Sequence, residues 1–170
     1  MGPEILLTLF LVLLNGFFVA AEFAIVKVRI SQIQVKAANS FTGRIAESVV
    51  SNLDGYLAAT QLGITLASLG LGWIGEDVMT KLILSAMEGL RIPVDEALAH
   101  RIALPIAFSV ITVLHIVFGE LAPKTLAIRY PTSTTLYTSV PLKAFYFVFR
   151  PFIYILNGLA NFILRLIGIQ

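Results

Sequence analysis

The sequence predicts an all-α integral membrane domain, and three observations lead to this fold class. Of its 170 residues, 58% are hydrophobic and only 13% are charged, which is about half the charged share of an ordinary soluble domain. Three apolar segments are each long enough to cross a bilayer as a helix, which takes about 20 residues. The segment after the first of them mixes apolar and charged residues at helical spacing, as interfacial helices do. A surface with so few charges needs lipid as its solvent.

The first predicted span covers about residues 5–26 and ends at Lys27 and Arg29. It has no basic residues before its apolar stretch, and about 22 apolar residues exceed the length of a signal-peptide core. We therefore predict a mature helix rather than a cleaved leader. The amphipathic stretch that follows, residues 30 to about 53, is predicted to lie at the membrane interface.

The second span is predicted at about residues 56–74 and the third at about 102–128. A polar connection with a short helix, about residues 78–90, joins them. The tail, about residues 133–169, is apolar but is interrupted by two prolines, two asparagines and Arg165. We predict that it forms juxtamembrane amphipathic belt helices at the inner face of the membrane, with a fourth span as the alternative.

Loop charges predict the orientation, because Lys and Arg accumulate in cytoplasmic loops. The first connection, residues 27–55, holds four Lys or Arg, and the region from Lys124 onward holds five. The second connection, residues 75–101, holds three together with five acidic residues. The N-terminus is thus predicted outside, and the first connection and the C-terminus in the cytoplasm.

Composition also excludes several classes of function. A net charge of +2 argues against nucleic acid as a partner, and the absence of cysteine excludes thiolate metal sites, disulfides and cysteine nucleophiles. No nucleophile elbow, phosphate-binding glycine loop or His/Glu zinc pattern is found. We therefore do not expect an enzyme.

The segment FGELAPK, residues 118–124, carries the strongest functional signal. Glu120 is a carboxylate inside a predicted span, where a charge costs on the order of 3 kcal/mol to insert. Pro123 has no N–H, so the carbonyl of Gly119 loses its helical partner. Carboxylate and carbonyl oxygens are ligands that hard cations prefer, so the pair predicts a cation site. The alternative is that Glu120 pairs with Lys124, one turn later.

The first two spans add candidate ligands. Asn15 and Glu22 share one face of the first span. Thr65 and Ser68 share a face of the second, whose three glycines indicate a helix that breaks or unwinds. The alternatives are an interhelical hydrogen bond for Asn15, an interfacial position for Glu22, and hydroxyls that bond back to their own helix. His115 is interpreted as a hydrogen-bonded structural histidine, with a proton relay or ligand as the alternative.

In the predicted orientation, these residues fall in the inner and middle parts of the bilayer, where one cavity open to the cytoplasm could reach them all. The ligand set contains only oxygen: carboxylates, an amide, hydroxyls and a carbonyl. Such a set suits Mg²⁺, Ca²⁺ or Na⁺ and disfavours soft metals.

Three segments, NGFFVAAEFAIVKVR, LGITLASLGLGWIGE and VFGELAPKTLAIRYP, resemble the transmembrane domain of the CorC/CNNM magnesium transporters, specifically a bacterial CorC. The resemblance covers essentially the whole chain. It implies a multi-pass homodimer of three-span protomers in the cell (inner) membrane, with a cytoplasmic belt. It also implies Mg²⁺ export by alternating access, driven by Na⁺ entry, from an inward-facing cavity lined by the three helices.

Residue by residue, the resemblance implies that Glu120 and Gly119 stand at the family's glutamate motif. Ser68 stands where animal members tend to have Asn, and Asn15 where they tend to have Ser. Val19 departs, because animal members tend to have Ser there. Full-length members also carry a cytoplasmic pair of nucleotide-binding CBS modules, which nothing in this sequence resembles and which we expect in the full-length protein.

Two other functions are open at this point. In a non-transporting membrane scaffold or Mg²⁺ sensor, Glu120 and the small residues would only hold subunits together. A channel would need a polar stripe through the outer leaflet, where the third span offers only Ser109 and Thr112.

Overall fold

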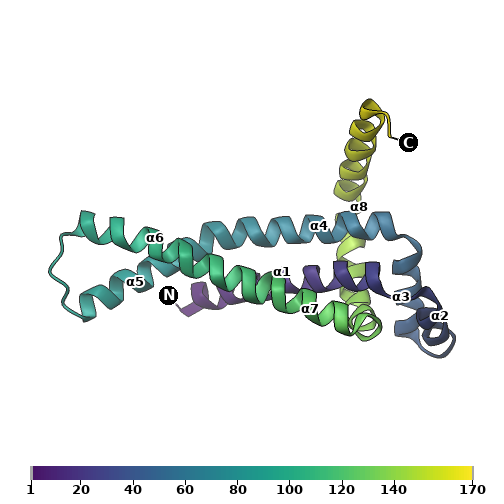
Figure 1. Ribbon diagram of the computed structural model, residues 1–170, viewed down its shortest axis with the longest axis horizontal. Coiled ribbons are helices and arrows are strands. Elements are labelled where there is room, and N and C mark those ends of the chain that lie inside the picture. The colour runs from purple at the N-terminus through teal and green to yellow at the C-terminus, as the bar shows by residue number, and fades with distance from the viewer. Residues whose placement is uncertain (1, 170) are drawn as a thin grey trace.

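The computed structural model describes residues 2–169, and these residues are almost entirely helical (Figure 1). No strand occurs within this range, so the predicted all-α membrane class is confirmed. In chain order the elements are α1 (Gly2–Lys27), α2 (Ile30–Asn39), α3 (Phe41–Ser51), α4 (Leu53–Gly70), η1 (Leu71–Gly75), α5 (Glu76–Gly89), α6 (Glu96–Leu114), η2 (His115–Leu121), α7 (Ala122–Arg129) and α8 (Pro131–Ile167).

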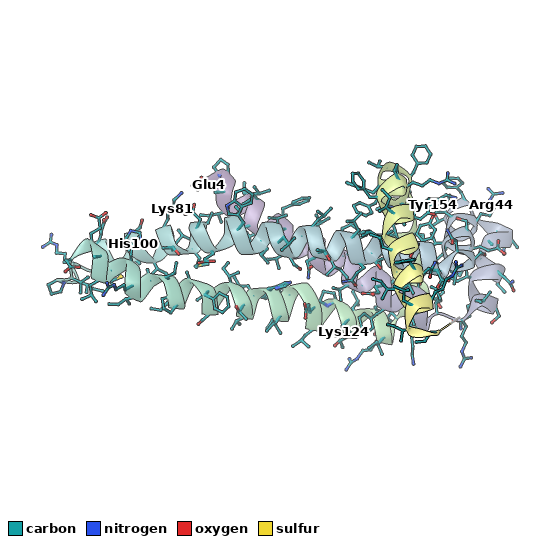
Figure 2. All side chains as sticks on the ribbon, turned by 90° about the horizontal axis from the view of Figure 1, so that it is seen from above. Glu4, Arg44, Lys81, His100, Lys124 and Tyr154 are labelled. Carbon is teal, nitrogen blue, oxygen red and sulfur yellow. The ribbon has the colours of Figure 1, made fainter. Side chains whose placement is uncertain are left out.

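Three long arms form the body of the molecule: α1, the continuous helix α4–η1–α5, and the continuous helix α6–η2–α7 (Figure 1). Helix α1 packs against α4 on one side and against η2 and α7 on the other. Helices α2 and α3 pack together at one end of the arms. Near that end α8 runs across the arms, at a steep angle to them in both views (Figures 1 and 2).

Within residues 2–169, four helices, rather than the predicted three, are long and apolar enough to cross a membrane by length and composition. The additional one is α8, which continues for 37 residues through Pro141 and Pro151. The two prolines were expected to break the tail. A long apolar helix tolerates proline because neighbouring groups can satisfy the carbonyls that it frees.

The short helix predicted at about residues 78–90 is present as α5, but it continues the second span without the expected break, so this arm stays helical to Gly89. Helix α5 is amphipathic: Val78 is buried while Asp77 is exposed. Asp77 Oδ2 pairs with Lys81 Nζ at 2.9 Å, one turn later, an arrangement that supports a surface helix.

The largest buried cluster anchors the arms to the elements at the α2–α3 end. Phe18 and Ile25 of α1 pack with Val49 of α3, Tyr56 of α4 and Leu142 of α8. The ring of Tyr56 also stacks on that of Tyr146, with centroids 4.5 Å apart. Helix α8 therefore belongs to the packed body, although most of its apolar side chains are exposed.

Gly16 lets α1 approach η2 and α7 closely. A Cβ at this position would lie 2.9 Å from the Phe118 carbonyl oxygen and 2.9 Å from Pro123 Cγ. Since one of these neighbours is backbone, it cannot move aside without displacing the helix. The glycine thus brings α1 against the part of the chain that contains Glu120.

We expect Gly16→Ala to lower the free energy of unfolding by about 1–3 kcal/mol, the usual effect of overpacking a close contact. Gly158→Ala is the matched control, because a Cβ there meets no atom within 4 Å and alanine is the better helix former. Thermal unfolding in detergent measures both. Equal midpoints for the two variants would contradict the close approach at Gly16.

Candidate cation site

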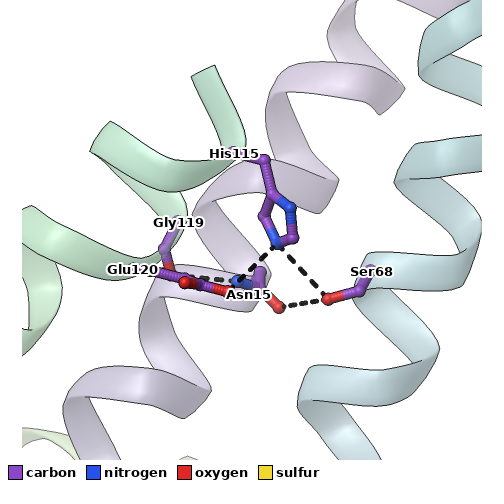
Figure 3. Close-up of polar contacts among 5 residues, drawn as sticks. All are labelled: Asn15, Ser68, His115, Gly119 and Glu120. Atoms are coloured by element: carbon purple, nitrogen blue, oxygen red, sulfur yellow. Dashed lines mark hydrogen bonds and ion pairs between the residues drawn. The ribbon is translucent and has the colours of Figure 1, made fainter. Parts of the chain in front are cut away.

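Polar groups from the three arms meet in one cluster (Figure 3). Asn15 comes from α1, Ser68 from α4, and His115, Gly119 and Glu120 from η2. The first two spans and the third therefore contribute to one cluster, as the sequence predicted for Asn15, Ser68, Gly119 and Glu120.

Asn15 joins the other two arms through its two amide atoms. Its Nδ2 donates to the Gly119 carbonyl oxygen at 2.9 Å, and its Oδ1 accepts from Ser68 Oγ at 2.9 Å. The residue is 0% exposed. Asn15 therefore forms interhelical hydrogen bonds, as the alternative interpretation expected. Its side-chain oxygen also lies within the candidate site, where it could bind a cation.

The hydrogen bonds of Ser68 indicate where the proton of His115 lies. A hydroxyl has one proton, and Ser68 donates its proton to Asn15. Ser68 Oγ can therefore only accept a hydrogen bond in its second contact. That contact is with His115 Nε2 at 3.4 Å. The arrangement therefore favours the tautomer of His115 in which Nε2 carries the hydrogen.

The same nitrogen faces Glu120, with Nε2 and Oε1 3.8 Å apart. These residues are five apart, which in an α-helix would place them about 140° apart around the axis. The chain here is a π-helix instead, whose hydrogen bonds link residues five apart. The amide of Ala122 accordingly bonds to the carbonyl of Val117. The wider turn brings His115 and Glu120 to one face.

His115 was interpreted from sequence as structural, and its position in the cluster was not predicted. The only sequence signal for the wider turn is Pro123, which cannot donate to the Gly119 carbonyl. The prediction that this carbonyl lacks its helical partner agrees with the structure, where the side chain of Asn15 bonds to it.

Glu120 does not form the alternative pair with Lys124. Within residues 2–169 its one ion-pair contact is with the His115 ring, at 3.8 Å, and its side chain is 43% exposed. The ammonium of Lys124 lies 4.8 Å from the ring centroid of Phe23, a cation–π contact. The carboxylate is therefore free of a permanent cation.

Two predicted ligands lie outside the cluster. Thr65 is exposed, donates to the carbonyl of Gln61 in its own helix at 2.8 Å, and lines a groove between α4 and α8. Glu22 lies two helical turns beyond Asn15, about 10 Å along α1 at 1.5 Å per residue, and is partly buried. Among the described residues, no hydrogen bond or ion pair joins either of them to Glu120.

The described chain holds no group of three or more His, Cys, Asp or Glu placed to bind a metal. A cation in the cluster would thus be held by one carboxylate and mainly neutral oxygens. Such a shell suits an ion that binds and leaves, since conduction needs binding that is favourable but not too tight.

A sequence model described as the Cyclin M transmembrane N-terminal domain (CNNM) matches residues 6–170. The chain belongs to this family. The resemblance to CorC/CNNM proteins is thereby confirmed, and the arms that carry the cluster are those of the family's membrane domain.

Similar proteins include two from Bacillus subtilis and one from Mycobacterium tuberculosis. The UPF0053 protein YrkA is 47% identical over 94% of this chain and 37% of its own length. The UPF0053 protein YhdT is 44% identical over 94% of this chain and 34% of its own length. The uncharacterized protein Rv1841c is 34% identical over 98% of this chain and 47% of its own length. The chain thus spans less than half the length of these relatives.

We expect Asn15→Leu to lower the free energy of unfolding by about 1–3 kcal/mol, because it leaves buried partners of a hydrogen bond unpaired. Asn161→Leu, which replaces an exposed amide on α8, is the matched control and should change stability little. Thermal unfolding in detergent compares the two. A midpoint for Asn15→Leu equal to that of the control would show that the bridge does not hold the arms together.

Proposed function

We propose that this membrane domain exports Mg²⁺ by alternating access, driven by Na⁺ entry, and that the cluster around Glu120 is its cation site. The observation that carries the proposal is the convergence of three arms on an unneutralised carboxylate. Asn15, Ser68 and the Gly119 carbonyl form one hydrogen-bonded group. His115, which contacts Ser68, also contacts Glu120. Mg²⁺ as the cargo and Na⁺ as the driving ion are the expectations that follow from membership in the family.

In this structure the neutral groups are hydrogen-bonded to one another. The amide of Asn15 donates to the Gly119 carbonyl, and the hydroxyl of Ser68 donates to the Asn15 oxygen. Each amide or carbonyl oxygen has two lone pairs, so a cation that binds directly can use the second lone pair or displace the present donor. Displacement would rotate the amide of Asn15 or shift the arms, and would couple ion binding to movement of α1 against η2.

Mg²⁺ holds its water tightly and is often bound through one or two carboxylates with several waters retained. One carboxylate with neutral oxygens matches that pattern. Glu120 would supply the charge, and Asn15, Ser68 and the Gly119 carbonyl would accept or replace water. Thr65 and Glu22 would take part only in another conformation, because neither reaches the cluster here.

The placement of α8 supports its proposed role as a belt. If the three arms cross the bilayer, a helix that crosses them at a steep angle runs along the membrane surface (Figures 1 and 2). Its three basic residues then lie on the proposed cytoplasmic side, with those of α2 and α3. Homodimerisation and attached CBS modules are further parts of the proposal; the greater length of the relatives leaves room for such modules.

We expect Glu120→Gln to weaken Mg²⁺ binding at least about tenfold, equivalent to about 1.4 kcal/mol, because it removes the only full charge from the site while keeping its shape. Isothermal titration calorimetry measures the affinity, and circular dichroism checks the fold. Glu88→Gln, an exposed glutamate near the end of α5, should bind Mg²⁺ like the parent. Unchanged affinity in folded Glu120→Gln would rule out this site.

Flux measurements separate transport from the rival function of a scaffold or sensor. In proteoliposomes with Mg²⁺ inside, an inward Na⁺ gradient should accelerate Mg²⁺ release, and Glu120→Gln should abolish the acceleration. A scaffold or sensor would bind Mg²⁺ without any movement that depends on Na⁺ or on Glu120.

A further inference from the structure

Two adjoining hollows lie along α7, at the end of the third arm where α8 begins (Figure 1). The first hollow has a volume of about 520 Å³ and runs from Val117 to Arg129 and Tyr130. The second hollow, of about 560 Å³, lies between α1, α7 and the start of α8. Ala122 and Leu126 line both. Each volume is within the range of sites that bind small ligands.

The polarity of the first hollow changes along its length. Val117 and Leu121 provide exposed apolar side chains at one end, and Arg129 and Tyr130 provide polar ones at the other. Twelve residues separate Val117 from Arg129, which is about 18 Å at 1.5 Å per residue. One leaflet holds about half of the roughly 30 Å hydrocarbon core. The hollow therefore has the length and the polarity of one lipid molecule in one leaflet.

The second hollow offers room for another acyl chain. Its walls are mainly apolar and include Leu13 and Phe17 of α1 and Phe118 of η2. Because the two hollows share Ala122 and Leu126, their contents would lie side by side along α7. This arrangement fits the two parallel chains of a glycerophospholipid.

The charge at the end of the first hollow favours an anionic headgroup. Arg129 is exposed and takes part in none of the ion pairs found within residues 2–169, whereas Lys124 of the same helix contacts the ring of Phe23. A guanidinium matches the geometry of a phosphate and can donate two hydrogen bonds to it.

The surroundings of Arg129 have the same sign. Residues 27–54 and 122–150, which form the elements at this end of the arms, hold eight basic residues and two acidic ones. They are Lys27, Arg29, Lys36, Arg44, Lys124, Arg129, Lys143 and Arg150, against Glu47 and Asp54. Basic residues gathered beside membrane spans attract anionic lipids.

We propose that the two hollows bind one anionic glycerophospholipid, with its phosphate at Arg129 and one acyl chain on each side of Leu126. The bound lipid would contact α1, α7 and the start of α8, and would stabilise their packing because it binds only the folded chain. That its leaflet is the cytoplasmic one rests on the proposed orientation. The binding itself does not depend on Mg²⁺ transport.

Native mass spectrometry of the delipidated protein in detergent tests the proposal by counting bound lipids. The probes are dioleoyl phosphatidylglycerol and dioleoyl phosphatidylcholine, which differ only in the headgroup. We expect one phosphatidylglycerol per chain to bind more tightly than phosphatidylcholine. Arg129→Gln should weaken phosphatidylglycerol binding roughly tenfold, because it removes charge-assisted hydrogen bonds, and should leave phosphatidylcholine binding unchanged. Ala122→Phe fills the space that the hollows share and should weaken binding of both lipids.

Two matched variants separate this site from general effects of charge and bulk. Arg44→Gln removes an exposed arginine of α3, and Ala86→Phe enlarges an exposed residue of α5; neither residue lines a hollow. Both variants should bind phosphatidylglycerol like the parent, and circular dichroism checks the fold of all four.

Three results would overturn the proposal. Equal affinity of the parent for the two lipids would exclude the headgroup contact. An equal loss of affinity in Arg44→Gln and Arg129→Gln would show attraction to the charged end as a whole. Unchanged affinity in folded Ala122→Phe would place the lipid elsewhere, and if that variant also separates a dimer into monomers, the surface belongs to a contact with a second copy of the chain. If Ala122→Phe does not fold, the comparison of Arg129→Gln with Arg44→Gln decides.

Discussion

The arrangement of the membrane arms depends on one buried amide. Asn15 is fully enclosed and bonds to a backbone carbonyl of the third arm and a hydroxyl of the second. A polar side chain among apolar helices must find partners within the protein, because lipid offers none. The hydrogen bonds of Asn15 thus link all three arms. Its side-chain oxygen is also of the kind that binds hard cations.

The local shape of the third arm follows from the same region. Pro123 cannot donate to the carbonyl of Gly119, and the chain widens to a π-helix just before it. The wider turn places His115 and Glu120 side by side, and Gly16 gives α1 the room to bring Asn15 against Gly119. The backbone irregularity and the candidate carboxylate are therefore one feature of the structure. If the proposed function holds, a shift of this turn is also how ion binding would move the arms.

Much of this was predictable from particular residues. The low charge and the apolar segments predicted an all-α membrane domain. The grouping of Asn15, Ser68, Gly119 and Glu120 in one cluster followed from a carboxylate inside a predicted span, a proline and small polar residues at helical spacing. The role of His115 was not predictable from α-helical geometry, because residues five apart share a face only in a wider helix.

Other differences have similarly local causes. Thr65 was grouped with Ser68 by spacing alone, but three residues along a helix are about 60° apart around the axis, enough for one to face α1 and the other to face the groove by α8. The short helix after Ile74 was predicted, but its direct continuation from the second span was not, because Gly72, Gly75 and the acids that follow indicated a break.

The central claim is that a cation binds among Glu120, Asn15, Ser68 and the Gly119 carbonyl. The most direct test is an experimental structure with Mn²⁺ in place of Mg²⁺, in which anomalous scattering locates the ion. The account predicts a peak bound to the Glu120 carboxylate directly, at about 2.0–2.2 Å, or through one retained water. Mn²⁺ bound elsewhere, with Glu120 unoccupied, would contradict it.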